Sequence, residues 1–534
     1  MYHGYGMFVR TKVFKNRDGS TRTYLQIVKG ERVGGKVRQV VVANLGRLDE
    51  LQGGGLDRLI EGLARFSRHQ AVRSKASQPE AGWAKSWGPA LVFGRLWEEL
   101  GLPAILERLL GDTAAVSDYG EAVFAMVLNR LCDPGSKLRV SEWVQTVYRP
   151  GWERLELQHF YRALDFLTER KAEIETRVYD RASDLFNLEV DLVLWDTTTT
   201  YFEGRAAEGL AGFGYSKDKR PDRVQIMVGV LMSRDGFPVA HEVFPGDTAE
   251  VETFRHVLAE VRTRFKLGRV ILVADRGMVS EKVLGEIEEA GLEYIVGVRM
   301  RRLSAAGEVL SRAGRYREVA PNLKVKEVLH EGRRYVVCLN PEEAARDAKV
   351  REETLAKLRE KLQSGGAKQL IGNSAFRRYL KLDAAGLSID ADAARAEARY
   401  DGKYVLRTNS SLCPEEVAQA YKSLWQVERA FRELKSGLDL RPVYHWTEKR
   451  IRGHVMVCFL ALVLETALRR KLAAVQADVR YDDLLQHLTE LRAVEIRLDG
   501  RRYLTRTELT GLAPLAFKAV GLRPPNHVIE MPRP

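Results

Sequence analysis

Two short apolar runs, each followed at once by an aspartate, place the strongest constraint on how this chain can fold. Residues 192–195 lead into Asp196, and residues 270–274 lead into Asp275. Short runs of this kind are typical of strands buried on both faces of a sheet. Removing a carboxylate from water is costly, so an acid at the end of a buried strand needs a partner. A metal ion is one such partner, and the threonine hydroxyls and amides after Asp196 are another. The residues alone leave both explanations open.

The segments around these two runs alternate between strand-like and helical patterns. Strand-like patterns cover residues 190–195, 224–232, 238–244, 270–274 and 294–298, and helical patterns cover residues 250–265 and 280–290. Three strands, a helix, a strand, a helix and a strand imply a mixed sheet covered by helices. Ligand sites in such domains favour the ends of strands, which is where we expect Asp196 and Asp275.

The whole chain divides into segments of different pattern, and its length of 534 residues is too great for a single core. The predicted fold class is α/β, a mixed-sheet core interrupted by an insertion domain, with an N-terminal β-hairpin region and helical N- and C-terminal regions. The predicted segments are 1–52 for the β-strand region, 53–188 for a helical region, 189–300 and 399–440 for the two parts of the core, 301–398 for the insertion, and 441–534 for the C-terminal helical region.

A predicted helix over residues 414–436 carries two stripes of side chains. The first is an ordinary apolar core stripe, formed by Leu424, Val427, Phe431, Leu434 and Leu438. The second is offset by one residue, which turns it by about 100° around the helix, and contains Tyr421, Trp425, Glu428, Arg432 and Lys435. An exposed charged face rarely aligns two aromatic residues with an acid and two bases. Taken alone, however, this stripe is explained equally well by a solvent-exposed face.

Together, the strand-end acids Asp196 and Asp275 and the helical Glu428 form a candidate metal site. Three carboxylates can hold two Mg²⁺ or Mn²⁺ ions, because hard cations prefer oxygen ligands. Two such ions about 3.5–4 Å apart can activate a water or a 3′-OH and stabilise the leaving oxygen of a phosphodiester.

The charge balance points to a polyanionic partner. Lys and Arg outnumber Asp and Glu by 85 to 72, a formal net charge of +13, which suits nucleic acid. The glycine-broken loop over residues 204–223 adds bases that include Lys217 and Arg220. Flexible basic loops contact phosphates without reading sequence, although a merely solvated loop fits these residues about as well.

Neither a membrane span nor a disulfide framework is predicted. The longest apolar run, residues 455–464, covers ten residues between charged flanks, which favours a buried helix over a bilayer span. The four cysteines are far apart and form no CxxC pair, as expected in a reducing compartment. We therefore expect a cytoplasmic, nucleoid-associated protein without a membrane partner.

At these acids the sequence resembles the ribonuclease-H-like DDE transposases of bacterial insertion sequences, in particular the cut-and-paste group with an insertion before the catalytic Glu. Their signature is Tyr, two residues, Arg, three residues, Glu, six residues and Lys. Here it reads Tyr421, Leu424, Glu428 and Lys435, so Leu424 replaces the expected Arg. That departure removes one phosphate contact, which Arg432 or Arg429 could replace.

Further stretches are similar in order along the chain, at residues 195–204, 214–217, 274–277, 401–408 and 450–454, so the resemblance covers roughly residues 190–470. It implies that Asp196, Asp275 and Glu428 hold two Mg²⁺ or Mn²⁺ ions.

The resemblance also implies DNA contacts. Tyr421 and Lys435 would contact phosphates, and Trp425 would either stack on a flipped base or pack beneath the active site. The remaining expected contacts are Arg432, Lys217 and Arg220. The implied partners are the terminal inverted repeats of the element and a target DNA, bound by a homodimer in a synaptic complex. We expect the helical region over residues 53–188 to bind the element ends.

Two other functions fit the same residues. A structure-selective nuclease would need the three acids but would perform no strand transfer. A catalytically inactive DNA-binding protein would need none of them, and the presence of Asp196, Asp275 and Glu428 argues against it.

Overall fold

The computed structural model describes residues 7–33, 36–51, 53–64, 79–111, 116–186, 188, 192–203, 206–265, 270–275, 278, 280–301, 304–363, 374–383, 386–498 and 501–530. The chain forms two compact units. The first consists of Met1–Glu80 with Arg497–Arg502 and residue 533, and the second contains the remaining residues.

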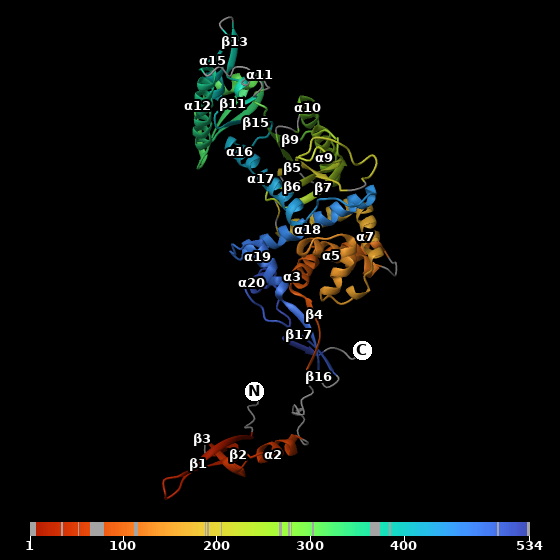
Figure 1. The fold of residues 1–534 in the computed structure, drawn as a ribbon, viewed down its shortest axis with the longest axis vertical. Helices are drawn as coiled ribbons and strands as arrows, with labels where there is room; N and C mark the ends of the chain where they lie inside the picture. The colour runs from red at the N-terminus through yellow and green to blue at the C-terminus, as the bar shows by residue number, and fades with distance from the viewer. Residues whose placement is uncertain are drawn as a thin grey trace. The chain divides into compact units, whose positions relative to one another are not determined.

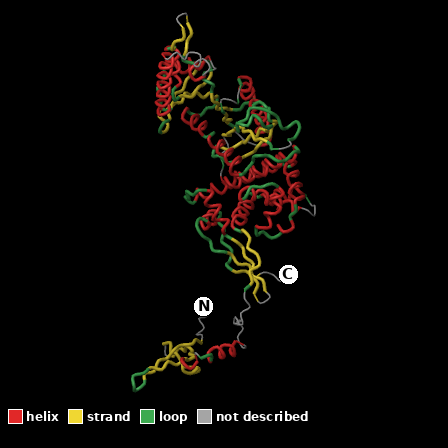
Figure 2. Tube along the Cα trace, viewed as in Figure 1, coloured by secondary structure: helices red, strands yellow, loops and turns green. Residues whose placement is uncertain are grey.

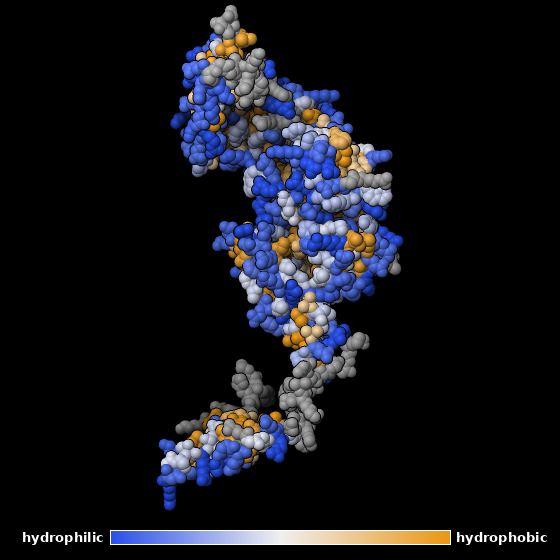
Figure 3. All heavy atoms as spheres, in the orientation of Figure 1, coloured by the Kyte–Doolittle hydropathy of each residue, from blue (hydrophilic) through white to orange (hydrophobic). Residues whose placement is uncertain are grey.

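The N-terminal unit is built on a three-stranded antiparallel sheet, as predicted, formed by β1 (Met7–Lys15), β2 (Thr21–Val33) and β3 (Lys36–Arg47). The turn after β1 is closed by Asp18, whose carboxylate accepts the Ser20 N–H, and by Gly19 at φ +82°. Two helices follow, α1 (Leu48–Leu51) and α2 (Gly55–Ala64). Hydrophobic side chains remain on its surface, as Figure 3 shows, among them Val9, Val13, Val37 and Val42.

The second unit contains a nine-stranded mixed sheet in the order β10-β11-β12-β15-β9-β8-β5-β6-β7 (Figures 1 and 2). The strands are β5 (Leu192–Tyr201), β6 (Gln225–Ser233), β7 (Pro238–Pro245), β8 (Ile271–Ala274), β9 (Glu293–Gly297), β10 (Arg317–Ala320), β11 (Leu323–His330), β12 (Arg333–Leu339) and β15 (Lys403–Thr408). Strands β5, β8 and β9 are parallel, and their other neighbours pair antiparallel. The predicted mixed sheet is therefore confirmed.

Both faces of the central strands are buried, because side chains alternate between two cores. Val193 and Trp195 of β5 pack with the helices α9 (Glu250–Arg264) and α10 (Glu281–Glu289). Leu192 and Leu194 face the other way, into the core shared with the C-terminal helices. By the same alternation, residue 196 lies on the side of Leu192 and Leu194.

The predicted insertion over residues 301–398 is in part continuous with the sheet. Its strands β10, β11 and β12 join the sheet through β15, which pairs with both β12 and β9. A helix, α11 (Ser304–Ser311), packs on these strands. The remainder of the segment has a small core of its own around Leu358 and Tyr379. It consists of α12 (Pro341–Gln363), α14 (Ser374–Arg377), β13 (Leu380–Asp383), β14 (Gly386–Ile389) and α15 (Ala391–Glu397).

A layer of helices packs below the sheet. It contains α3 (Gly88–Glu99), α4 (Leu102–Leu110), α5 (Val116–Cys132), α6 (Lys137–Trp143), α7 (Leu157–Glu169), α8 (Lys171–Phe186), α18 (Glu448–Ala474), α19 (Tyr481–Glu490) and α20 (Ala513–Ala519). Helix α18 lies on the sheet side of this layer, in contact with α3, α5, α7 and β7 (Figure 1). Within the described residues, α18 alone is long and apolar enough to cross a membrane, but 89% of its apolar window is buried. The prediction that residues 455–464 form a buried helix is confirmed.

The C-terminal region is not wholly helical, which corrects the prediction for residues 441–534. A four-stranded sheet has the order β18-β17-β16-β4 and consists of β4 (Glu80–Ser86), β16 (Arg492–Leu498), β17 (Arg501–Arg506) and β18 (Val528–Glu530). These strands were not predicted from the sequence, because charged residues interrupt the alternation of apolar side chains. In β16, for example, the buried positions are Ala493 and Glu495.

Candidate active site

The parallel register of β5 and β8 brings the two aspartates together. Leu192 pairs with Ile271 and Leu194 pairs with Val273, so the next position on the same face aligns Asp196 with Asp275. The sheet order thus turns two acids that are far apart in sequence into neighbours on adjacent strands.

Asp196 does not lie at a strand end, contrary to the prediction. Strand β5 continues through the four threonines to Tyr201 and pairs with β6 along that length, whereas β8 ends at Ala274. The β-branched threonines favour an extended strand. Asp196 therefore lies where the parallel pairing with β8 stops, and Asp275 is the first residue beyond β8.

The Asp196 carboxylate is confined but incompletely satisfied. Its Oδ1 accepts the Thr197 N–H at 2.7 Å. Among the described residues, no threonine hydroxyl donates a hydrogen bond to this carboxylate. The threonines therefore provide only one of its hydrogen bonds, through the Thr197 N–H. Burial raises the pKa of Asp196 to about 6, and the nearby Asp275 and Glu250 carboxylates add to the rise, while Lys217 and the Thr197 N–H oppose it.

Lys217 supplies the nearest positive charge. Its Nζ lies 3.6 Å from Asp196 Oδ1 and 2.9 Å from Glu250 Oε1, and it donates to the Thr197 carbonyl oxygen at 2.6 Å. Burial lowers the pKa of Lys217, but the Asp196 and Glu250 carboxylates outweigh this effect and leave the pKa above its usual value. Lys217, predicted as a DNA contact, is thus directed toward the acids in this structure.

The predicted continuous helix over residues 414–436 is broken in the structure. It consists of α16 (Pro414–Lys422), α17 (Trp425–Arg432) and a π-helical turn, Glu433–Gly437. At the break, Leu424 N–H bonds to Tyr421 O and Val427 N–H bonds to Leu424 O, which is the tighter 3₁₀ spacing. The periodicity of the side chains does not record this local change of backbone hydrogen bonding. The break could therefore not be predicted from the sequence.

The segment from Tyr421 to Lys435 is fixed at both ends by hydrogen bonds to aspartates. The Tyr421 hydroxyl donates to Asp275 Oδ1 at 2.7 Å, and Lys435 Nζ donates to Asp218 Oδ1 at 2.7 Å. Glu428 lies seven residues from each of them on α17, which packs on β5 and β6. Its side chain is exposed.

The three predicted acids are not gathered into one ready-made cluster. In the part of the chain that the structure describes, no three or more Asp, Glu, His or Cys side chains are grouped closely enough to hold a metal ion. The donor set nevertheless fits a divalent cation, because two carboxylates are neighbours and the pKa of Asp196 is raised by burial and by Asp275. A cation would offset this accumulation of negative charge.

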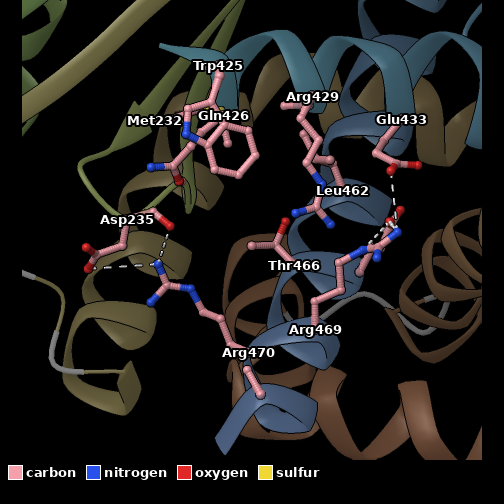
Figure 4. Close-up of a pocket in the computed structure, with 14 residues that line it drawn as sticks. Met232, Asp235, Trp425, Gln426, Arg429, Glu433, Leu462, Thr466, Arg469 and Arg470 are labelled. Carbon is pink, nitrogen blue, oxygen red and sulfur yellow. Dashed lines mark hydrogen bonds and ion pairs between the residues drawn. The ribbon is translucent and has the colours of Figure 1, made fainter. Parts of the chain in front are cut away.

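Trp425 lines a cavity of about 200 Å³ between α17 and α18. Figure 4 shows Trp425 and Arg429 facing Arg469 and Arg470 across this cavity. The Trp425 side chain is 56% exposed, so it is not buried beneath the active site.

The remaining predicted DNA contacts differ in their surroundings. Arg432 is exposed and makes no ion pair with any described residue. Arg220 pairs with Asp222 at 2.9 Å and lies over the Tyr201 ring. Lys435 is partly buried, and Asp218 is its partner.

Sequence reasoning missed two acids of the site, Glu250 and Asp218. Glu250 begins α9, where an acid is common at any helix N-terminus. Asp218 lies between two lysines in a polar loop, yet its side chain is only 4% exposed and also pairs with Arg441. Neither position has a local signal that distinguishes it from an ordinary surface acid.

Two family models match the chain. One, described as the transposase DDE domain, matches residues 190–464, which is more than half of the chain. The other, described as the N-terminal domain of IS1634 family transposases, matches residues 9–76. No curated protein matches the sequence.

The chain therefore belongs to the DDE transposases, enzymes that bind DNA and use divalent metal ions. The N-terminal match makes it a transposase of an IS1634-family insertion sequence. This membership decides between the functions considered above in favour of the transposase, and the large mixed sheet is consistent with a ribonuclease-H-like DDE domain.

Proposed function

We propose that Asp196, Asp275 and Glu428 are the catalytic acids of this transposase and hold two Mg²⁺ or Mn²⁺ ions. The observation that carries the proposal is the parallel register that aligns Asp196 with Asp275. The Tyr421–Asp275 hydrogen bond supports it, because this bond ties the segment that bears Glu428 to the same edge of β8.

Bound ions would activate the attacking water or 3′-OH and stabilise the leaving oxygen. Asp196 and Asp275 would bind on the sheet side, and Glu428 would complete the site from α17. Irregular turns flank α17 on both sides, and π-helical turns are frequent at functional sites, so we propose that this short helix shifts toward the aspartates when the ions bind. The same site would serve both DNA cleavage and strand transfer.

The proposal extends to the fold of the core and to the residues that contact DNA. The sheet would be a ribonuclease-H-like core interrupted by the insertion, with the Tyr-Arg-Glu-Lys signature degenerate at Leu424. Tyr421, Arg432, Lys435, Lys217 and Arg220 would contact DNA phosphates once DNA competes for their present partners. Trp425 would stack on an unpaired base.

The proposed partners are the terminal inverted repeats and a target DNA in the bacterial cytoplasm, at the nucleoid. A homodimer would hold two element ends in one synaptic complex.

The test measures whether DNA cleavage and insertion depend on a divalent metal ion. Purified protein is incubated with both element ends and a target plasmid, in Mg²⁺ or in EDTA. We expect Mg²⁺-dependent excision and insertion, and we expect Asp196→Asn, Asp275→Asn and Glu428→Gln each to reduce cleavage by about 100- to 1000-fold or more.

Asp184→Asn is the matched control, because Asp184 is an exposed acid on α8 outside the site. It should cleave like the parent protein. Near-normal cleavage by any of the three variants would remove that acid from the catalytic set.

A further inference from the structure

The negative charges around Asp196 are balanced only in part by the chain itself. Asp196 and Glu250 approach one ammonium group, Lys217 Nζ, at 3.6 and 2.9 Å, and Asp275 adds a further negative charge to this region. The Lys217 side chain is only 28% exposed, so water screens these interactions weakly. A single lysine therefore supplies positive charge to the acids that a divalent cation would otherwise neutralise.

We propose that Lys217 is the internal counter-ion of the metal-free active site, which a divalent ion must displace from Asp196 when it binds. The inference rests on the proposed function, since it takes Asp196 as a metal ligand. Lys217 is thus a positioning residue that acts on metal binding through Asp196.

The loop around Lys217 is held by contacts that do not use its ammonium group. The Lys217 backbone N–H donates to Thr199 Oγ1 at 2.9 Å, and the Arg220 N–H donates to Ser216 Oγ at 3.1 Å. The neighbouring Asp218 is buried and bound by Lys435 and Arg441. Replacing Lys217 by Met also removes the hydrogen bond from its Nζ to the Thr197 carbonyl oxygen, but the other contacts should keep the loop in place, so the variant reports mainly on the lost charge.

Removing the counter-ion makes the site more negative, which strengthens the attraction for a divalent cation and removes a competitor for Asp196. We expect Lys217→Met to bind Mn²⁺ about three- to tenfold more tightly than the parent protein, and Lys217→Arg to keep an affinity close to the parent value. A lysine that only supports the loop would have the opposite effect, because its loss would weaken the site.

Mn²⁺ is the probe, and its dissociation constant is measured by electron paramagnetic resonance of the free ion at pH 8, without DNA. Lys219→Met is the matched control, because Lys219 lies in the same loop, carries the same charge, and its side chain makes no hydrogen bond or ion pair with a described residue. Circular dichroism and thermal unfolding verify that each variant is folded.

Tighter binding by Lys217→Met, together with parent-like binding by Lys219→Met, supports the counter-ion. The inference is overturned if the two variants bind Mn²⁺ equally, or if Lys217→Met binds it more weakly than the parent. Asp196→Asn reports separately on the proposed function. If that variant keeps full Mn²⁺ affinity, Asp196 is not a ligand and the catalytic assignment itself fails.

Discussion

At the scale of single residues, the site is defined by acids whose charges are only partly balanced. Asp196 has one amide and one distant ammonium as partners, and Glu428 is exposed. A third acid, Glu465, lies on α18 and lines the same cavity as Trp425.

Trp425 is an exposed aromatic residue that we propose stacks on an unpaired base. Because stacking on an aromatic ring contributes about 1–3 kcal/mol, we expect Trp425→Ala to slow second-strand cleavage by roughly 5- to 100-fold. First-strand nicking should be unchanged. The two steps are separated on gels with strand-specific labels, and Trp446→Ala serves as the control, since Trp446 is also exposed. Unchanged double-strand cutting would refute the stacking role.

The buried Glu465 should make the stability of the fold depend on pH. Burial raises the pKa of Glu465 to about 7, and Glu433 adds to the rise, while Arg469 opposes it. The raised pKa means that ionisation disfavours the folded state increasingly as the pH rises from about 4.5 to 7. Glu465→Gln avoids this penalty and can still accept the Arg469 N–H.

We therefore expect Glu465→Gln to raise the free energy of unfolding by about 1–3 kcal/mol at pH 8. The gain should shrink by more than half at pH 5. Urea denaturation at the two pH values measures both, and an equal gain at pH 5 and pH 8 would contradict the assignment.

At the scale of secondary-structure elements, the pairing of β5 with β6 depends on a glycine. Gly229 lies opposite Thr197, and a Cβ there would come within 2.0 Å of the buried Trp195 ring. The indole next to Asp196 thus occupies space that only glycine leaves free.

Gly229→Ala should destabilise the fold by about 1–3 kcal/mol, as overpacking does in other cores. Gly285→Ala on α10 is the control, because a Cβ there meets nothing within 4 Å and alanine favours a helix. Chemical denaturation of both variants measures the difference. If both variants are equally stable, the close packing of Trp195 on Gly229 has no energetic importance.

At the scale of the whole molecule, the two family matches fall in different units. Residues 9–76 lie in the N-terminal unit, and residues 190–464 lie in the second. The whole chain carries a formal net charge of +13, which attracts the negatively charged phosphates of DNA. Binding to DNA should therefore depend strongly on contacts with phosphates.

We expect the affinity for an element end to fall by roughly 10- to 1000-fold between 50 and 200 mM NaCl, because neutralised phosphates release counterions. Fluorescence anisotropy with labelled DNA in EDTA measures this dependence without cleavage. An affinity that is independent of salt would show that phosphate contacts contribute little to binding.

The sequence by itself determined the elements whose signal is local. Apolar runs predicted β5 and β8, and the run over residues 455–464 predicted the buried core of α18. The pairing of an acid with each buried run also identified Asp196 and Asp275 as candidates. These features could be predicted because burial and backbone propensity act on neighbouring residues.

Only the tertiary structure decided how distant residues meet. Lys217 reaches Glu250, and Lys435 reaches Asp218, across 33 and 217 residues of sequence. The extension of the sheet by β10–β12 likewise arises from pairing with β15. The helix break at Leu424 and the continuation of β5 beyond Asp196 were set by hydrogen bonds that side-chain periodicity does not record. Long-range charge and backbone pairing leave no pattern in a local stretch of sequence, and for that reason the counter-ion of the site became visible only in the folded chain.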